Sequence, residues 1–193
     1  FCHNKNLYKN ILSKVYKYYM KILAVQSRMG IGDTVIFLPF IKALSKKFNS
    51  PISILVKENS KANQYLHQTK YIDKILTLER DNKTNNRHGG FFGIFKLAND
   101  LKKYKFDKIF IFNSSLRFNL VAKISGIPQI YQYPLFAKNK QHIIEAPKKF
   151  LKKNLDLDIN EDPEVQIDND SISKAAQKFQ IDKNTTNILL GIG

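Results

Sequence analysis

A glycine-containing turn, Ser27-Arg-Met-Gly-Ile-Gly-Asp33, is the clearest chemical feature of the sequence. It follows a short apolar run, Lys21 to Gln26, and it precedes apolar residues at helical spacing. A strand, a turn and a helix in this order place the turn at the carboxyl end of a strand, where parallel α/β sheets bind ligands. A carboxylate at that place can accept a proton from a substrate hydroxyl. Asp33 is therefore a candidate general base.

The same turn has two other interpretations. Asp33 can be the N-cap of the following helix, and the residues alone favour this cap over the base, since any strand–turn–helix unit needs one. Gly30-Ile-Gly32 can instead belong to a dinucleotide-binding turn, with Glu58 after the second strand as the ribose-binding acid. That interpretation is weaker, because Val35 stands where a third glycine is expected and because the Asp33 carboxylate would repel a pyrophosphate.

Other candidate groups carry less information. The strings Asp156-Leu-Asp158 and Asp168-Asn-Asp170 could hold a divalent cation, but they lie in an acidic segment away from the strand ends, so we interpret them as solvated charge. The four histidines lack ligand spacing, and we expect His88 to be an exposed loop residue. His142 and Glu145 lie one helical turn apart, where they could reach a site together or form a local surface pair. We expect no metal site.

The apolar pattern predicts short strands that alternate with helices. Strands are expected at 21–26, 52–56, 75–78, 108–112 and 127–133, and helices at 39–48, 60–68, 94–104, 114–126, 142–153 and 171–179. The first of these helices is expected to begin at Pro39, because proline is favoured at the first helical position. Strands that alternate with helices predict an α/β fold with a Rossmann-like parallel sheet and right-handed crossovers.

The charge of the chain is large and uneven. Lys and Arg number 32 against 16 Asp and Glu, which gives a net charge of +16. Residues 154–193 hold eight acids and three lysines, a net −5, so residues 1–153 carry +21. A basic body of this kind suits a polyanion or an anionic membrane surface. Only four of the basic residues are Arg, the preferred bidentate phosphate ligand, so we do not expect nucleic acid as a partner.

The ends of the chain suggest a fragment with three parts. Residues 1–19 are interpreted as a basic leader or a short amphipathic helix, and residues 20–165 as the Rossmann-like domain. The apolar run at 187–193 is typical of a strand that begins a second domain, so 166–193 are interpreted as a linker and the start of that domain. No apolar stretch approaches the ~20 residues that a membrane-spanning helix needs. One cysteine excludes a disulfide framework.

Several segments together resemble the opening of glycosyltransferase family 9, the bacterial lipopolysaccharide heptosyltransferases. These segments are Met20–Gln26, Arg28–Asp33, Leu38–Leu44 and Ile52–Val56. Further matches follow in the same order, at Tyr71–Ile75, Lys105–Phe110, the 114–126 helix, and His142 with Glu145. The resemblance implies the N-terminal, acceptor-binding half of a two-domain enzyme of the GT-B type.

The resemblance also implies a function. The family inverts the anomeric configuration and needs no metal or other cofactor, and the carboxylate of its Gly-Asp loop is the general base, which corresponds to Asp33. It implies a nucleotide-sugar donor, ADP-heptose being expected, and a lipopolysaccharide-core or related glycolipid acceptor. The implied substrate-binding residues are Arg28, Gly30, Gly32, Ser114, Arg117, His142 and Glu145. The segment Asn113–Arg117 lacks the Asp and Gln often seen there, which leaves the acceptor open.

The basic charge of the chain is compatible with an enzyme at a membrane or with a non-enzymatic binding domain. The enzyme would be cytoplasmic and able to lie on the inner face of the cell membrane, where acceptor phosphates would be drawn to its basic half. The non-enzymatic alternative is a basic α/β domain that binds nucleic acid or a membrane surface without sugar specificity, with an affinity that falls steeply as salt is added.

Overall fold

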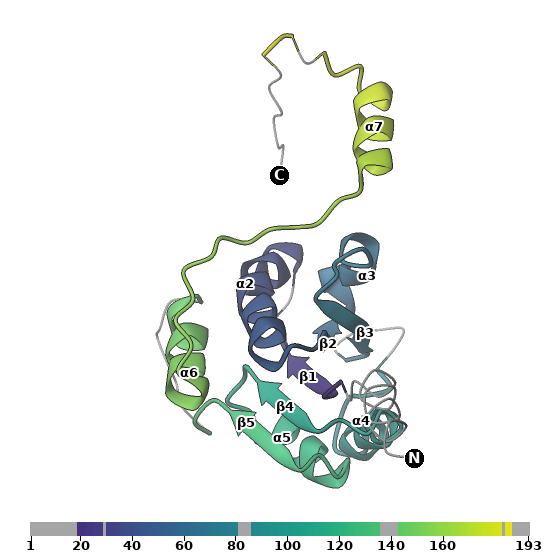
Figure 1. The fold of residues 1–193 in the computed structure, drawn as a ribbon. Coiled ribbons are helices and arrows are strands. Elements are labelled where there is room, and N and C mark those ends of the chain that lie inside the picture. The colour runs from purple at the N-terminus through teal and green to yellow at the C-terminus, as the bar shows by residue number, and fades with distance from the viewer. Residues whose placement is uncertain (1–18, 29, 81–85, 136–142, 183, 187–193) are drawn as a thin grey trace, which may run out of the picture.

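A five-stranded parallel sheet forms the centre of the molecule. The computed structural model describes residues 19–28, 30–80, 86–135, 143–182 and 184–186. Within them the strands lie in the order β3-β2-β1-β4-β5 (Figure 1). Their bounds are β1 Ile22–Val25, β2 Ile52–Lys57, β3 Ile72–Leu78, β4 Lys108–Ile111 and β5 Gln129–Gln132. The order steps outward from β1 in both directions, which confirms the expected Rossmann-like α/β fold.

Helices cover both faces of this sheet. They are α2 Ile31–Phe48, the 3₁₀ turn η1 Glu58–Ser60, α3 Ala62–Tyr65, α4 Phe92–Lys102, α5 Leu116–Ile124 and α6 Glu145–Leu155. A further helix, α7 Asn169–Lys178, has no buried residue and lies apart from the sheet. The core is divided by the sheet, with α2, α3 and α6 packed on one face and α4 and α5 on the other. Side chains of a strand alternate between its faces, so Ile22 and Ala24 join the first half of the core and Leu23 and Val25 the second.

Several element boundaries differ from the sequence prediction, and two of these differences have a clear physical reason. The helix expected to begin at Pro39 begins at Ile31 and contains Pro39 in its interior. Burial of Phe37, Leu38 and Phe40 in the core offsets the lost backbone hydrogen bond, because tertiary packing outweighs local preference. Strand β3 is longer than expected and begins at Ile72, since it lies at the edge of the sheet, where polar residues can face solvent. The terminal strand and the leader fall outside the described residues.

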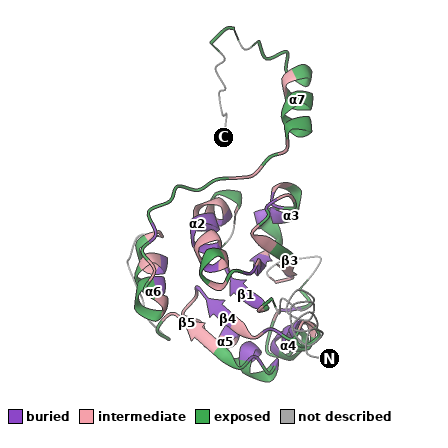
Figure 2. Cartoon of the chain, in the orientation of Figure 1, coloured by how far each residue is buried: buried purple, intermediate pink, exposed green. Residues whose placement is uncertain are grey.

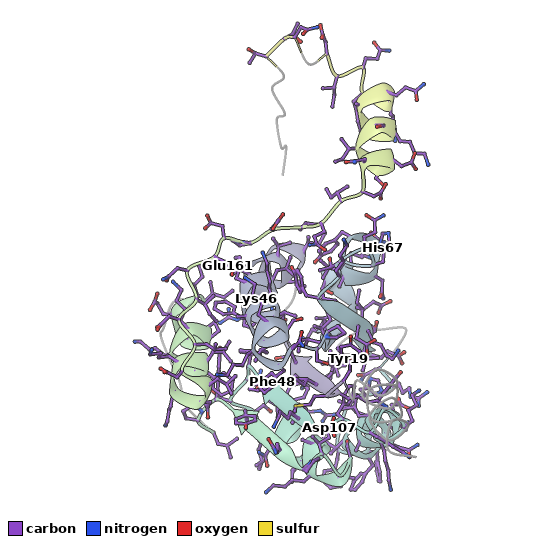
Figure 3. All side chains as sticks on the ribbon, viewed as in Figure 1. Tyr19, Lys46, Phe48, His67, Asp107 and Glu161 are labelled. Carbon is purple, nitrogen blue, oxygen red and sulfur yellow. The ribbon has the colours of Figure 1, made fainter. Side chains whose placement is uncertain are left out.

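The acidic segment between α6 and α7 runs across the top of α2 toward α3 (Figure 1). Ile159 is buried in the core beside α6. Glu161 forms ion pairs with Lys46 and, at 3.2 Å, with Lys42, and Figure 3 shows Glu161 and Lys46 side by side. Such exposed ion pairs contribute little free energy each, so the buried isoleucine is the stronger anchor. This segment is therefore packed against the sheet domain by apolar contacts as well as ion pairs.

The two Asp-x-Asp strings form contacts within the chain. Asp156 and Asp158 both pair with Lys152, at 2.7 and 2.6 Å. Asp168 is the N-cap of α7, where its carboxylate accepts hydrogen bonds from the backbone and hydroxyl of Ser171 and from Gln68. These groups remain on the surface, as expected of solvated charge, but each string has a local structural role.

Asp168 gives a pH-dependent prediction. The hydrogen bonds from Ser171, the backbone one first, and from Gln68 lower the pKa of Asp168 from 3.8 to about 2. Because the folded pKa lies below the unfolded value, the capping contribution is complete above pH ~4 and is lost as the pH falls through about 2. We expect the Ser171 amide resonance to titrate with a midpoint near pH 2 in an NMR series, and Asp168→Asn to abolish that titration. A midpoint near 3.8 would contradict the capped geometry.

Candidate functional site

The turn after β1 is held in shape by a buried glutamine. Gln26 is 4% exposed, its Oε1 accepts a hydrogen bond from the Arg28 backbone N–H at 2.9 Å, and its Nε2 donates to the Asp33 carbonyl at 3.3 Å. One side chain thus joins both ends of the turn. Sequence reasoning did not single out Gln26, although an amide directly after a buried apolar strand needs internal hydrogen-bond partners.

Gly30, and not Asp33, is the N-cap of α2. Its backbone has φ 109° and ψ 158°, a conformation that favours glycine. The Thr34 hydroxyl donates to the Gly30 carbonyl at 3.1 Å. Asp33 lies in the first turn of the helix, so the N-cap interpretation of Asp33 is wrong, while the helix dipole still favours its negative charge.

The Asp33 carboxylate turns back over the start of α2. A Cβ atom built on Gly30 would lie 3.6 Å from Asp33 Oδ2, so the carboxylate is next to the glycine at the helix N-terminus. Asp33 is half-buried, and Gly32 beside it is exposed. A pyrophosphate bound at this N-terminus would meet a negative charge, which disfavours the dinucleotide interpretation.

The turns after β4 and β5 are joined to the turn after β1. The Asn113 amide donates to Ser27 Oγ at 2.6 Å, and Gln132 Nε2 donates to the carbonyls of Asn113 and Ser115, both at 2.9 Å. Ser115 caps α5, its hydroxyl accepting from the Arg117 backbone N–H. Ser114 lies between these braced residues, so the structure brings it to the same edge of the sheet as Asp33.

Arg117 has a structural position. Its guanidinium donates to the backbone carbonyl of Gly90 at 2.7 Å and to that of His88, which joins the start of α5 to the turn before α4. Two of its donors are thus directed at the protein's own backbone, and nothing in this geometry supports the expected contact with substrate.

His88 is buried, and the expectation of an exposed loop histidine is wrong. It is 4% exposed, its Nδ1 accepts from the Glu79 backbone N–H at 3.1 Å, and its Nε2 lies 3.0 Å from Asp100 Oδ2. The bond at Nδ1 requires the proton on Nε2, so the neutral ring donates to Asp100. This polar contact ties the end of β3 to α4 and explains why a loop histidine is in the interior.

Arg28 and Tyr133 add a cation and a phenol to the same edge. Tyr133 follows β5, and its ring packs edge-on against Phe112 and Phe150, at centroid distances of 5.9 and 5.0 Å. Burial raises the pKa of Tyr133, and the positive charge of Arg28 lowers that pKa in part. The Tyr133 hydroxyl is buried and has no hydrogen-bond partner among the described residues.

The remaining candidates lie on or before α6. Glu145 is the first residue of that helix and is exposed, and His142 lies outside the described residues. Ala146, next to Glu145, lines a cavity of about 430 Å³ together with Tyr133 and Phe150. No cluster of metal-binding side chains occurs in the described part of the chain, and within it no helix is long and apolar enough to cross a membrane.

The carboxyl edge of the sheet therefore presents two groups that can act on a polar substrate. Asp33 can accept a proton and Arg28 can attract an anionic group, whereas the Tyr133 hydroxyl at the same edge is buried. Sequence reasoning found the first two and missed Tyr133. The signal available was its place directly after the fifth strand, at the end where ligands bind.

Comparison with solved structures gives a match to this architecture. The glycosyl transferase family 9 protein from Veillonella parvula matches with a TM-score of 0.66 and 17% identity, over 90% of this chain and 55% of that one. The E. coli ADP-heptose lipopolysaccharide heptosyltransferase II matches at 0.58 and 15%, over 85% and 52%. The fold matches half of a GT-B glycosyltransferase.

A third structure extends this result. The E. coli heptosyltransferase WaaC with ADP-2-deoxy-2-fluoro heptose matches at a TM-score of 0.50 and 13% identity, over 74% of this chain and 50% of that one. The chain thus spans about half the length of the structures that it matches. No family model and no curated protein sequence matched. The resemblance to glycosyltransferase family 9 is confirmed as a similarity of fold.

Proposed function

We propose that the chain is the acceptor-binding half of an inverting glycosyltransferase. It would help to move a sugar, heptose being the expected one, from a nucleotide-sugar donor to a lipopolysaccharide-core or related glycolipid acceptor. The observation that carries the proposal is the position of Asp33, a half-buried carboxylate in the first turn of α2 at the carboxyl edge of the sheet. The fold match to half of a GT-B enzyme supports it.

The reaction is a direct displacement. Asp33 accepts the proton of an acceptor hydroxyl while that oxygen forms a bond to the anomeric carbon of the donor. The bond from that carbon to the nucleoside diphosphate breaks, and the diphosphate leaves with the electron pair. Arg28 holds an anionic group of the acceptor. Positioning of the acceptor by this residue makes the attack effectively intramolecular.

The donor requires a second half, which we propose to be of the same GT-B kind. Residues 20–165 then form the acceptor domain, and 166–193 lead toward the donor domain. A helix N-terminus and cations in that domain would stabilise the leaving diphosphate. The acidic segment packed across α2 fits this division, because it carries the chain away from the sheet domain to the separate helix α7.

Sugar transfer by the two halves tests the proposal. We expect residues 1–193 alone to fold without transferring sugar, and we expect transfer from ADP-heptose to a lipopolysaccharide-core acceptor once a donor-binding half is fused to them. The measurement is release of nucleoside diphosphate together with the mass of the glycosylated product. Transfer by residues 1–193 alone would contradict the proposal that a second half is needed to bind the donor. Salt-sensitive RNA binding by the fused protein, without any sugar transfer, would favour the non-enzymatic alternative.

A further inference from the structure

The outer faces of α4 and α5 carry an unusual number of exposed apolar side chains. Phe91 and Phe92 at the start of α4 are 69% and 77% exposed, and Phe95 one turn later is 48% exposed. On α5 the exposed apolar residues are Leu116, Leu120 and Ile124. We call these six residues the α4–α5 patch. Single exposed apolar residues are ordinary, but a cluster on two adjacent helices indicates an interaction surface.

The two helices form one continuous surface. They pack side by side on the same half of the core. At their starts Arg117 donates to the Gly90 carbonyl, and toward their ends Ser125 Oγ donates to the Ala98 carbonyl at 3.1 Å. Contacts at both ends require the helices to run alongside each other, so their outward faces adjoin. Figure 2 shows much of α5 exposed.

The patch lies near the candidate site but is separate from it. Both helices begin after the carboxyl ends of strands, so the three phenylalanines and Leu116 lie toward the edge that carries Asp33. Their side chains lie on the solvent-facing sides of α4 and α5, while the inner sides of these helices fill the core. A surface in contact with the patch would therefore leave the edge itself open to substrate.

The charge around the patch is positive. Residues 86–126 hold eight Lys and Arg against two Asp, a net +6. Both acids are engaged: Asp100 with Arg87 and His88, and Asp107 with the Lys21 backbone N–H at 2.7 Å. The exposed lysines of the two helices are Lys96, Lys102 and Lys123, and Lys103 directly follows α4. Exposed aromatic residues beside exposed lysines are typical of a surface that binds anionic membranes.

A second copy of the chain fits this surface less well. Two patches facing each other would bring together the exposed lysines of both copies, which repel. Lysine is also depleted in protein–protein interfaces, whereas aromatic residues with lysine are favoured at the boundary between headgroups and acyl chains. An anionic lipid surface offers both an apolar layer for the rings and phosphates for the lysines.

We propose that the α4–α5 patch is a membrane-docking surface that inserts Phe91, Phe92 and Phe95 into the headgroup boundary of an anionic bilayer. The lysines of α4 and α5 pair with lipid phosphates around the inserted rings. The proposal rests on exposure, helix packing and charge, and it holds whether or not the chain takes part in glycosyl transfer. In a glycosyltransferase it would bring the carboxyl edge of the sheet to the height of a glycolipid headgroup.

Vesicle binding of a double variant tests the proposal. The probes are phosphatidylcholine vesicles with and without phosphatidylglycerol, and binding is measured by co-sedimentation. The full chain should bind the anionic vesicles and weaken as salt is added. Phe91→Ser with Phe92→Ser should lower the partition constant at least roughly tenfold, because each buried phenylalanine contributes substantially to transfer from water. Serine near the start of α4 is compatible with the helix, and circular dichroism checks that the variant is folded.

A matched control distinguishes binding by this patch from nonspecific binding by any exposed aromatic ring. Phe179→Ser removes another ring that is 67% exposed, at the end of α7, and it should leave vesicle binding unchanged. Equal losses in Phe179→Ser and in the double variant would overturn the proposal. Unchanged binding by the double variant, with binding lost when residues 1–18 are removed, would assign docking to the leader and overturn it as well. The proposal would also be overturned if the double variant lost self-association in sedimentation velocity but kept its binding to vesicles.

Discussion

Replacing Phe110 by alanine is expected to lower the free energy of unfolding by about 3–5 kcal/mol. Phe110 lies in β4 and is 0% exposed. Its ring stacks on Tyr131 of β5 at a centroid distance of 4.6 Å, and it also contacts Phe48 of α2 at 5.9 Å and Phe150 of α6 at 6.5 Å. Alanine would leave a cavity between a neighbouring strand and two helices that cannot all close in together. Urea denaturation followed by circular dichroism measures the loss.

Phe92→Ala is the matched control for this measurement. It makes the same chemical change at a ring that is 77% exposed, and we expect a change within about 0.5 kcal/mol. If Phe110→Ala cost no more than Phe92→Ala, the stacking of α2 and α6 on the central strands would be wrong.

The order of strands and helices could be predicted because parallel strands are buried on both faces. Three of the five strands, β1, β2 and β4, are near-continuous apolar runs, and such runs have few other interpretations. The start of β3 was missed because Asp73 and Lys74 interrupt its apolar pattern, which an edge strand tolerates. The start of α2 was missed because the proline rule is local, whereas Phe37 and Phe40 are held in the helix by the core.

The candidate site was predictable only where it depends on local order along the chain. Asp33 follows the first strand directly, so its place at the sheet edge follows from the fold class. The contacts that shape the site join distant segments: Asn113 and Ser27 are 86 residues apart, and Gln132 meets Asn113 from the next strand of the sheet. His88 was misjudged for the same reason, since its partner Asp100 lies on the next helix.

Asp33→Asn is expected to remove a factor of roughly 10²–10⁴ from the rate of sugar transfer. Asparagine keeps the size of the side chain and its carbonyl oxygen, but it cannot accept the acceptor's proton. The cost to stability should be small, because Gly30 and not Asp33 caps α2. What is lost is the favourable interaction of one negative charge with the first turn of the helix, worth about 0.3–1 kcal/mol. A large loss of rate with a nearly unchanged thermal midpoint is therefore the signature of a general base.

The most direct test of Asp33 as the general base compares the rates of sugar transfer by the unchanged protein and by Asp33→Asn. Both rates are measured with the donor-binding half present. Nucleoside diphosphate release and thermal unfolding are followed on the same preparations, with Asp73→Asn, an exposed acid on β3, as the control. We expect a rate loss of at least roughly 100-fold in Asp33→Asn alone, with all three proteins unfolding at similar temperatures. A near-normal rate in Asp33→Asn would contradict Asp33 as the base and make Glu145, at the start of α6, the next carboxylate to test.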